Sequence, residues 1–96
     1  MKYIIVSRHE ATVEYLRKVF PAAEVVGGLP QDWYDKEAIL VGNVPLWLAS
    51  RAHSVIAVEF LVQPPRGVEL TAEDLEQFGI RLVEYVVEQK GEVYPT

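Results

Sequence analysis

The sequence predicts an α/β fold, with a mixed, mostly parallel sheet of about five strands and helices on its faces, built as one domain from 96 residues. Two observations lead to this prediction. Short apolar runs that suit buried strands alternate with segments whose apolar residues recur at helical spacing. One of these runs, Ala38-Ile39-Leu40-Val41, is apolar without a break, as is typical of a central strand covered on both faces. Helices that cross over between parallel strands provide such cover. The alternation of strands and helices along the chain therefore favours a Rossmann-like architecture.

The first half of the chain begins with a strand and a helix. Leu16 and Phe20 lie at helical spacing, and Pro21 ends the helix because proline lacks the N–H that a helix interior needs. Ser7 and Glu10 are spaced as a capping box at the start of this helix. The expected elements are, in order, a strand over residues 2–6, a helix over 11–20, a strand over 24–26, an irregular segment or helical turn over 29–36, and the central strand over 38–41.

The second half continues the alternation. Pro45 is expected in the first turn of a helix, where its missing N–H costs nothing, and Thr71 with Asp74 resembles a capping box. Gly79 is expected to end a third helix in the left-handed conformation, and the Val- and Tyr-rich segment after it favours a strand; one long helix through Glu88 is the alternative. The expected elements are a helix from Pro45 to about Ala52, a strand over 54–61, a loop over 63–70, a helix from Thr71 and a strand over 81–88.

The composition is that of a folded cytoplasmic protein. Half of the residues are hydrophobic, and the absence of cysteine leaves neither disulfides nor thiolate metal sites to expect. No apolar stretch approaches the roughly 20 residues that span a bilayer, and the start lacks the features of a signal peptide, so no membrane association is expected. The net charge of −5 argues against binding to long nucleic acid, which usually needs a basic surface.

Polar and charged side chains gather at three of the expected strand–helix junctions. In parallel sheets the crevice outside the carboxyl ends of the strands collects ligands, because the N–H groups of helix starts point there. Arginine forks, helix N–H groups and neutral hydroxyl or amide donors together suit a phosphate. The residues concerned are Ser7, Arg8 and His9 after the first strand, Gly42 and Asn43 after the central strand, and Arg66, Gly67 and Glu69 after the fourth.

Each of these residues also has a purely structural interpretation. His9 suits a helix start, and Asn43 suits an N-cap. Arg66 with Gly67 suits a plain turn, and Glu69 suits a solvated surface. No closely spaced set of histidines and carboxylates stands out, so no metal or other cofactor is expected.

Three segments carry a resemblance that covers nearly the whole chain. They are "VSRHEATVEYL" near the start, "ILVGNVPLWLAS" in the middle and "RGVELTAEDLEQFG" ahead of the last segment. In order and spacing they resemble a small CRISPR-associated family, the sixteenth of the Csx series, which is found with type III systems and described as ring nucleases. The stretch from Arg66 to Thr71 also resembles viral anti-CRISPR ring nucleases. One departure is Asn43, because the family often has threonine after the central glycine.

The resemblance implies a specific activity. Such enzymes degrade cyclic tetra-adenylate, the ring-shaped second messenger of type III CRISPR defence, and so switch the response off. A ring of four identical nucleotides matches the symmetry of a two-fold interface, so a homodimer is expected. RNA supplies its own nucleophile, the ribose 2′-OH, which leaves a 2′,3′-cyclic phosphate; the protein then needs to align the attack, stabilise charge and move protons, without an obligatory metal.

The resemblance also suggests roles for the residues at the junctions. His9 is the expected acid/base or orienting group, and Arg8 and Arg66 are expected to clamp phosphates. The ligand-binding residues are expected to be Ser7, Gly42, Asn43, Gly67 and Glu69. Two alternatives stay open: a protein that sequesters the same ring without cutting it, and a plain interaction module.

Overall fold

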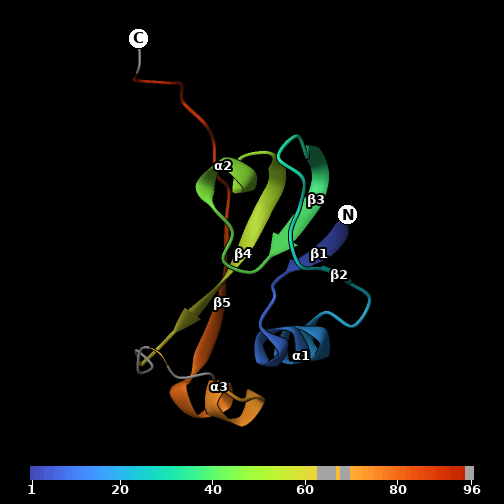
Figure 1. Cartoon of the computed structure of the whole chain (residues 1–96), viewed down its shortest axis with the longest axis vertical. Coiled ribbons are helices and arrows are strands. Elements are labelled where there is room, and N and C mark those ends of the chain that lie inside the picture. The colour runs from blue at the N-terminus through green and yellow to red at the C-terminus, as the bar shows by residue number, and fades with distance from the viewer. Residues whose placement is uncertain (63–66, 68–69, 95–96) are drawn as a thin grey trace.

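The computed structural model, which describes residues 1–62, 67 and 70–94, confirms the predicted α/β fold (Figure 1). The elements are β1 (Lys2–Val6), α1 (Glu10–Val19), β2 (Glu24–Val26), β3 (Asp35–Val41), α2 (Leu46–Ala49), β4 (Ala52–Phe60), α3 (Ala72–Phe78) and β5 (Ile80–Tyr85). In these ranges no helix combines the length and the apolar character that crossing a membrane requires.

The sheet has the strand order β2-β1-β3-β4-β5, and only β5 runs antiparallel to its neighbour. In register, Ile4 of β1 lies between Glu24 of β2 and Leu40 of β3. The chain leaves β1 for β2 on one side and then returns to β3 on the other side of β1. The gap between β1 and β3 is therefore the point where the strand order reverses, which is where open α/β sheets bind ligands.

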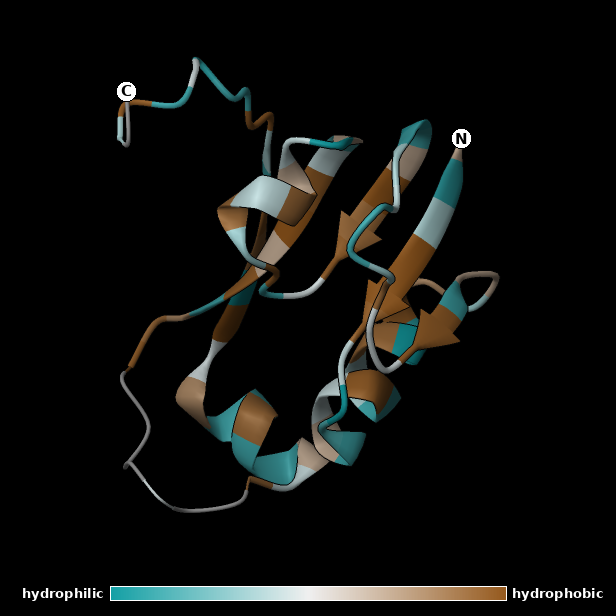
Figure 2. Ribbon diagram, turned by 45° about the horizontal axis from the view of Figure 1, so that its top comes forward, coloured by the Kyte–Doolittle hydropathy of each residue, from teal (hydrophilic) through white to brown (hydrophobic). Residues whose placement is uncertain are grey.

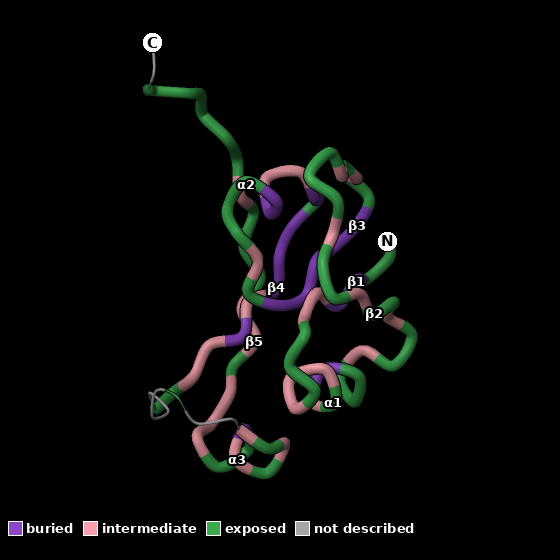
Figure 3. The backbone as a smooth tube through the Cα atoms, viewed as in Figure 1, coloured by how far each residue is buried: buried purple, intermediate pink, exposed green. Residues whose placement is uncertain are grey.

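Alternate residues of the central strands pack on opposite faces of the sheet, as the pleat requires. Ile5 and Ile39 belong to the cluster that contains Leu16 of α1, whereas Ile4 and Leu40 belong to the cluster that contains Leu48 of α2. Figure 2 shows the apolar residues concentrated in the strands and on the inner sides of the helices, and Figure 3 shows the buried stretches in the middle of the sheet. Both faces are thus covered, which explains the unbroken apolar run in β3.

The predicted capping box of Ser7 and Glu10 is wrong. Helix α1 begins at Glu10, its N-cap is His9, and no side chain makes a capping hydrogen bond. The Ser7 N–H, from which Glu10 would accept in a capping box, donates to the carbonyl of Val26 at 3.1 Å, so Ser7 extends the pairing of β1 with β2. Its hydroxyl instead accepts from the N–H of His9 at 3.2 Å.

The second helix is shorter than predicted. Helix α2 spans Leu46–Ala49, and Pro45 is its N-cap rather than a residue of its first turn. The sheet ends it early, because the carbonyl of Arg51 accepts from the N–H of Asp35 at 3.1 Å and Ala52 is already buried in β4. Residues near Ala52, which the sequence pattern assigned to the end of the helix, thus pair with β3 as the start of β4.

The C-terminal half confirms two predictions about local structure. The Thr71 hydroxyl accepts from the Asp74 N–H at 3.1 Å, and the Asp74 carboxylate accepts from the Thr71 N–H at 2.9 Å, so the capping box is present. Gly79 follows with φ of 74°, and β5 begins at Ile80, which excludes the long-helix alternative. Helix α3 lies beside α1, with Leu75 buried (Figure 1).

A hydrogen-bonded group ties β4 to the edge strand β5. The Glu59 carboxylate accepts from Arg81 Nε at 2.9 Å and from the Tyr85 hydroxyl. The bond from Tyr85 and the ion pair with Arg81 hold the pKa of Glu59 below its ordinary value of 4.5. The same bond raises the pKa of Tyr85 above its ordinary value of 10.0.

We expect Glu59→Gln to remove a stabilising contribution that depends on pH. A carboxylate whose pKa is lowered by folding stabilises the protein above its unfolded pKa and loses that contribution as pH falls through its folded pKa. The variant should therefore be less stable than wild type at pH 7, and the difference should disappear at pH values well below 4.5. Thermal melts between pH 7 and pH 3 measure this, with Glu92→Gln in the exposed C-terminal segment as the control. A difference that stays constant over this range would contradict the assignment.

Candidate functional site

A pocket of about 530 Å³ opens at the carboxyl ends of β1 and β3, where the strand order reverses. We call it the switch-point pocket. It brings together five residues that the sequence predicted for the site, from two separate junctions. Its lining consists of Val6, Ser7, Arg8, His9, Thr12, Gly27, Gly28, Leu29, Gly42, Asn43, Val44, Pro45, Trp47, Leu48, Val58 and Phe60.

The third predicted junction is only partly placed. Arg66 and Glu69 lie outside the described residues. Gly67 is exposed, has φ of 76° and does not line the switch-point pocket. The end of β4 contributes Val58 and Phe60 to the pocket instead, so the roles assigned to the loop after β4 stay predictions.

Arg8 is held across the end of β2. Its Nε donates to the carbonyl of Gly27 at 3.0 Å. A Cβ atom on Gly27 would lie 3.6 Å from Arg8 Cγ, and one on Gly28 would lie 3.7 Å from Arg8 Nη2, so the Arg8 side chain packs directly along these two residues. Within the described ranges Arg8 pairs with no carboxylate. Its terminal N–H groups can therefore grip an anion as a fork.

The start of α1 presents backbone donors beside Arg8. The first hydrogen bond inside the helix runs from the Val13 N–H to the carbonyl of His9 at 3.0 Å, so the N–H groups of residues 10–12 precede the helical ladder. Thr12 and His9 both line the pocket. The positive end of the helix dipole favours negative charge at this position. His9 itself is exposed, and its imidazole forms no hydrogen bond to the described part of the chain.

Asn43 is occupied by the sheet and is not an N-cap, because Pro45 holds that position of α2. Its side-chain amide pairs with the backbone of Val58: Nδ2 donates to the carbonyl at 3.2 Å, and Oδ1 accepts from the N–H at 3.0 Å. This pair imitates the backbone bonds between β3 and β4, the last of which runs from the Gly42 N–H to the Ile56 carbonyl at 2.9 Å, and it continues the pairing by one step. It also fixes the wall of the pocket.

We expect Asn43→Leu to lower the free energy of unfolding by about 1–3 kcal/mol, because both polar groups of the partly buried Val58 backbone lose their partner. Asn43→Asp should also lose stability, since a carboxylate accepts from the N–H but meets the carbonyl without a donor. Urea unfolding measures both values. Wild-type stability for both variants would show that the amide pair contributes nothing.

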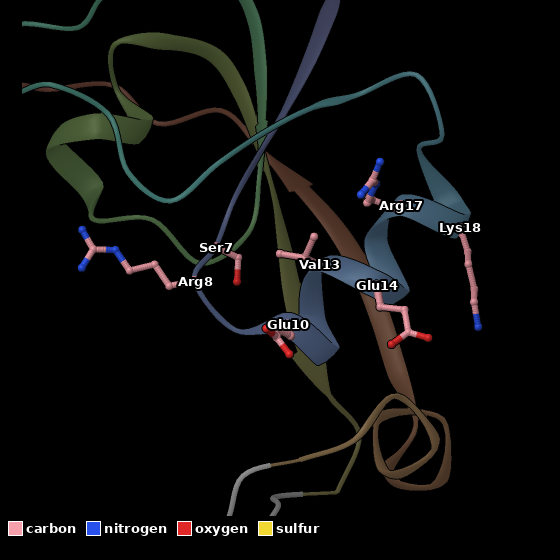
Figure 4. Close-up of a pocket in the computed structure, with 7 residues that line it drawn as sticks. All are labelled: Ser7, Arg8, Glu10, Val13, Glu14, Arg17 and Lys18. Atoms are coloured by element: carbon pink, nitrogen blue, oxygen red, sulfur yellow. The ribbon is translucent and has the colours of Figure 1, made fainter.

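A second pocket, the α1 groove, adjoins the first and shares Ser7 and Arg8 with it. Figure 4 shows Arg8 pointing away from Arg17 and Lys18, which lie along the helix. The remaining lining residues are Glu10, Val13 and Glu14. Its mixture of cations and carboxylates makes the α1 groove a weaker site for an anion than the switch-point pocket.

Sequence reasoning missed part of the pocket. Gly27 and Gly28, which the sequence analysis did not single out, line the pocket, and the Gly27 carbonyl accepts from Arg8 Nε. Trp47, which the sequence analysis did not single out either, is exposed and lines the pocket, whereas its neighbour Leu48 is buried. The signal for Trp47 was its place just after Asn43 and Pro45, inside a predicted site junction. Within the described ranges, no group of three or more His, Cys, Asp or Glu residues is arranged to hold a metal ion.

Comparison with known proteins gives one match. Residues 4–88 match the family described as "Putative CRISPR-associated protein (Cas_VVA1548)". Searches of curated proteins and of solved structures returned no match. The matched range begins inside β1 and runs past the end of β5, so it includes the other strands in full and every residue that lines the switch-point pocket.

Proposed function

The chain belongs to this CRISPR-associated family, and on that premise we propose that it is a ring nuclease, which binds cyclic tetra-adenylate, cleaves it without a metal and thereby switches off type III CRISPR signalling. The family supports the CRISPR setting. The ring nuclease activity rests on the resemblance of three segments and on the chemistry of the switch-point pocket.

One observation carries the proposal: Arg8, whose terminal N–H groups pair with no carboxylate in the described ranges, lines one pocket at the reversal of strand order together with His9 and Thr12 at the start of α1. Fixed donors aimed at one position stabilise the extra charge of a pentacoordinate phosphorus better than water does, because they need no reorganisation. The net charge of −5 does not oppose this, since the local arrangement of charge decides the binding of a small anion.

The proposed reaction uses the nucleophile of the substrate. The ribose 2′-oxygen attacks the adjacent phosphorus, the new bond closes a 2′,3′-cyclic phosphate, and the bond to the 5′-oxygen breaks. The proton of the 2′-OH leaves to a base, and the 5′-oxygen gains a proton. Arg8 holds the phosphate and His9 moves a proton or orients the linkage, while Arg66 is the proposed second clamp. Ser7, Gly42, Asn43, Gly67 and Glu69 complete the proposed contacts to the ring.

A homodimer is part of the proposal. A ring of four identical nucleotides presents two equivalent pairs of phosphates to a two-fold axis, so two copies of the switch-point pocket can each hold one pair. Light scattering on the purified protein measures the oligomeric state, and a monomer that cleaves the ring would remove this part of the proposal.

The decisive experiment incubates the protein with labelled cyclic tetra-adenylate in the presence of a chelator. We expect linear products of two or four nucleotides that end in a 2′,3′-cyclic phosphate. Cleavage that requires an added divalent metal would overturn the metal-independent mechanism. A protein that neither binds nor cleaves the ring would overturn the proposal and favour a plain interaction module.

The second candidate is a protein that sequesters the ring without cutting it. The observation that favours it is the imidazole of His9, which no hydrogen bond orients within the described residues, whereas catalytic bases are usually held by a further group. Tight binding with the ring intact after long incubation would select this function.

A further inference from the structure

The switch-point pocket has two unlike halves. The half built by the segment between β1 and α1 and by the start of α1 is polar, and the half built by the segment before and within α2, with Leu29 from the β2–β3 segment, is apolar. The polar half consists of Ser7, Arg8, His9 and Thr12, and the apolar half of Leu29, Val44, Pro45, Trp47 and Leu48. A nucleotide has the same division, with an anionic phosphate at one end and a flat, largely apolar base at the other.

Trp47 is the exposed aromatic surface of the apolar half. It is 43% exposed, whereas its neighbour Leu48 is 4% exposed and belongs to the core. The exposed ring is therefore not needed to fill the space under α2. An aromatic face at the wall of a pocket can stack with any nucleobase.

The indole ring is held in a fixed orientation. The guanidinium carbon of Arg51 lies 5.0 Å from the ring centroid, within the range of a cation–π contact. Arg51 also donates to the carbonyl of Gln31, which ties it to the segment between β2 and β3. The Ser50 hydroxyl donates to the Trp47 carbonyl at 2.7 Å and fixes the end of α2. The guanidinium covers at most one face of the ring, and an ordered ring loses little entropy when a base stacks on it.

We propose that Trp47 is the stacking platform for an adenine base of the ring, and that the apolar half of the switch-point pocket is a purine-base subsite. This inference rests on the proposed function and adds to it where the base is bound. Arg8, in the polar half, holds the phosphate, so the two residues together position one nucleotide of the substrate.

The first test measures the affinity for cyclic tetra-adenylate in variants of Trp47, under conditions where cleavage is slow. Trp47→Ala should raise Kd by roughly 5- to 150-fold, the usual cost of losing one stacked base. Trp47→Phe keeps an aromatic face and should retain most of the affinity, whereas Trp47→Leu is apolar but not planar and should lose it. The matched control is Trp33→Phe, because Trp33 packs against the core beside α2 and does not line the pocket.

A spectroscopic test reports on the ring directly. The chain has two tryptophans, so Trp47 is the only tryptophan in the Trp33→Phe variant, and excitation at a wavelength that tyrosine does not absorb reports on it alone. Cyclic tetra-adenylate should quench its fluorescence with the same Kd as binding, whereas ribose 5-phosphate, which carries the phosphate without a base, should not quench it. An unquenched emission at saturating ring would overturn the stacking contact.

The outcomes separate this inference from the proposed function. Wild-type affinity in Trp47→Ala, or equal affinity in Trp47→Leu and Trp47→Phe, would overturn the base subsite and leave the ring nuclease standing. A change of oligomeric state in Trp47→Ala would assign the residue to a subunit interface and also overturn the subsite. A wild-type protein that fails to bind the ring would overturn both.

Discussion

Arg8→Ala is expected to reduce cleavage of cyclic tetra-adenylate by about 100- to 1,000-fold, the scale seen when one charge-stabilising donor is removed from a transition state. The hydrogen bond from Arg8 Nε to the Gly27 carbonyl fixes the guanidinium. Its terminal N–H groups form no ion pair within the described part of the chain. Steady-state and single-turnover rates of the variant measure the loss. Arg8→Lys keeps the charge but not the fork, so it should recover only part of the rate.

The matched control is Arg17→Ala. Arg17 lies in α1 and carries the same charge as Arg8, but it lines the α1 groove and not the switch-point pocket (Figure 4). Its removal should change the rate by less than about threefold, because a distant exposed charge acts mainly through screened attraction. Equal losses in the two variants would mean that Arg8 contributes only to the general field around the protein.

Comparison with His9→Ala then assigns the dominant effect in catalysis. A larger loss in Arg8→Ala would indicate that charge stabilisation limits the reaction, and a larger loss in His9→Ala would indicate proton transfer. His9 lies at the N-cap of α1 with no side-chain capping bond, so its replacement leaves the helix start intact.

Gly42→Ala is expected to lower the free energy of unfolding by about 3 kcal/mol or more and to abolish ring binding at temperatures where the protein is still folded. Gly42 has φ of 131°, and a Cβ atom there would lie 2.6 Å from the backbone oxygen of Val6. A backbone oxygen cannot rotate away as a side chain can. The end of β1 would have to move, and Ser7 and Arg8 follow directly on the chain.

The control for this variant is Gly91→Ala. Gly91 also has a positive φ, 153°, but nothing lies within 4 Å of its Cβ position, so it separates the cost of the contact from that of the backbone conformation. Urea unfolding gives the stabilities, and titration with cyclic tetra-adenylate gives the affinities. A Gly42→Ala protein with wild-type stability and affinity would show that β1 and β3 can separate without harm to the pocket.

The fold was largely predictable because its signals are local and repeat along the chain. The unbroken apolar run of residues 38–41 predicts a strand that is covered on both faces, and all four residues are buried. The spacing of Thr71 and Asp74 predicts a helix start, and both hydrogen bonds of the capping box between them are present. The meeting of Arg8 with Asn43 in one pocket followed from a general rule about parallel sheets, once the strands had been found.

The errors arose where a side chain or a backbone group found a partner far away in the sequence. Ser7 has the spacing of a cap next to Glu10, but its N–H is claimed by Val26 across the sheet. Asn43 has the position of an N-cap, but its amide bonds to the backbone of Val58 and Pro45 is the N-cap of α2. Helix α2 ends earlier than predicted for the same reason, because the Arg51 carbonyl accepts from the N–H of Asp35 in the neighbouring strand.

The spacing of apolar and capping residues along the chain was therefore enough to predict the type and order of the helices and strands. The reason is that apolar periodicity and capping depend on neighbours within a few residues. Which groups are free to bind was settled by packing. The Gly27 carbonyl accepts from Arg8 Nε, and Leu48 is buried while Trp47 stays exposed, only because strands and loops distant in sequence lie together. The physical reason is that a donor or a ring remains available for a ligand only if no distant part of the folded chain has already claimed it.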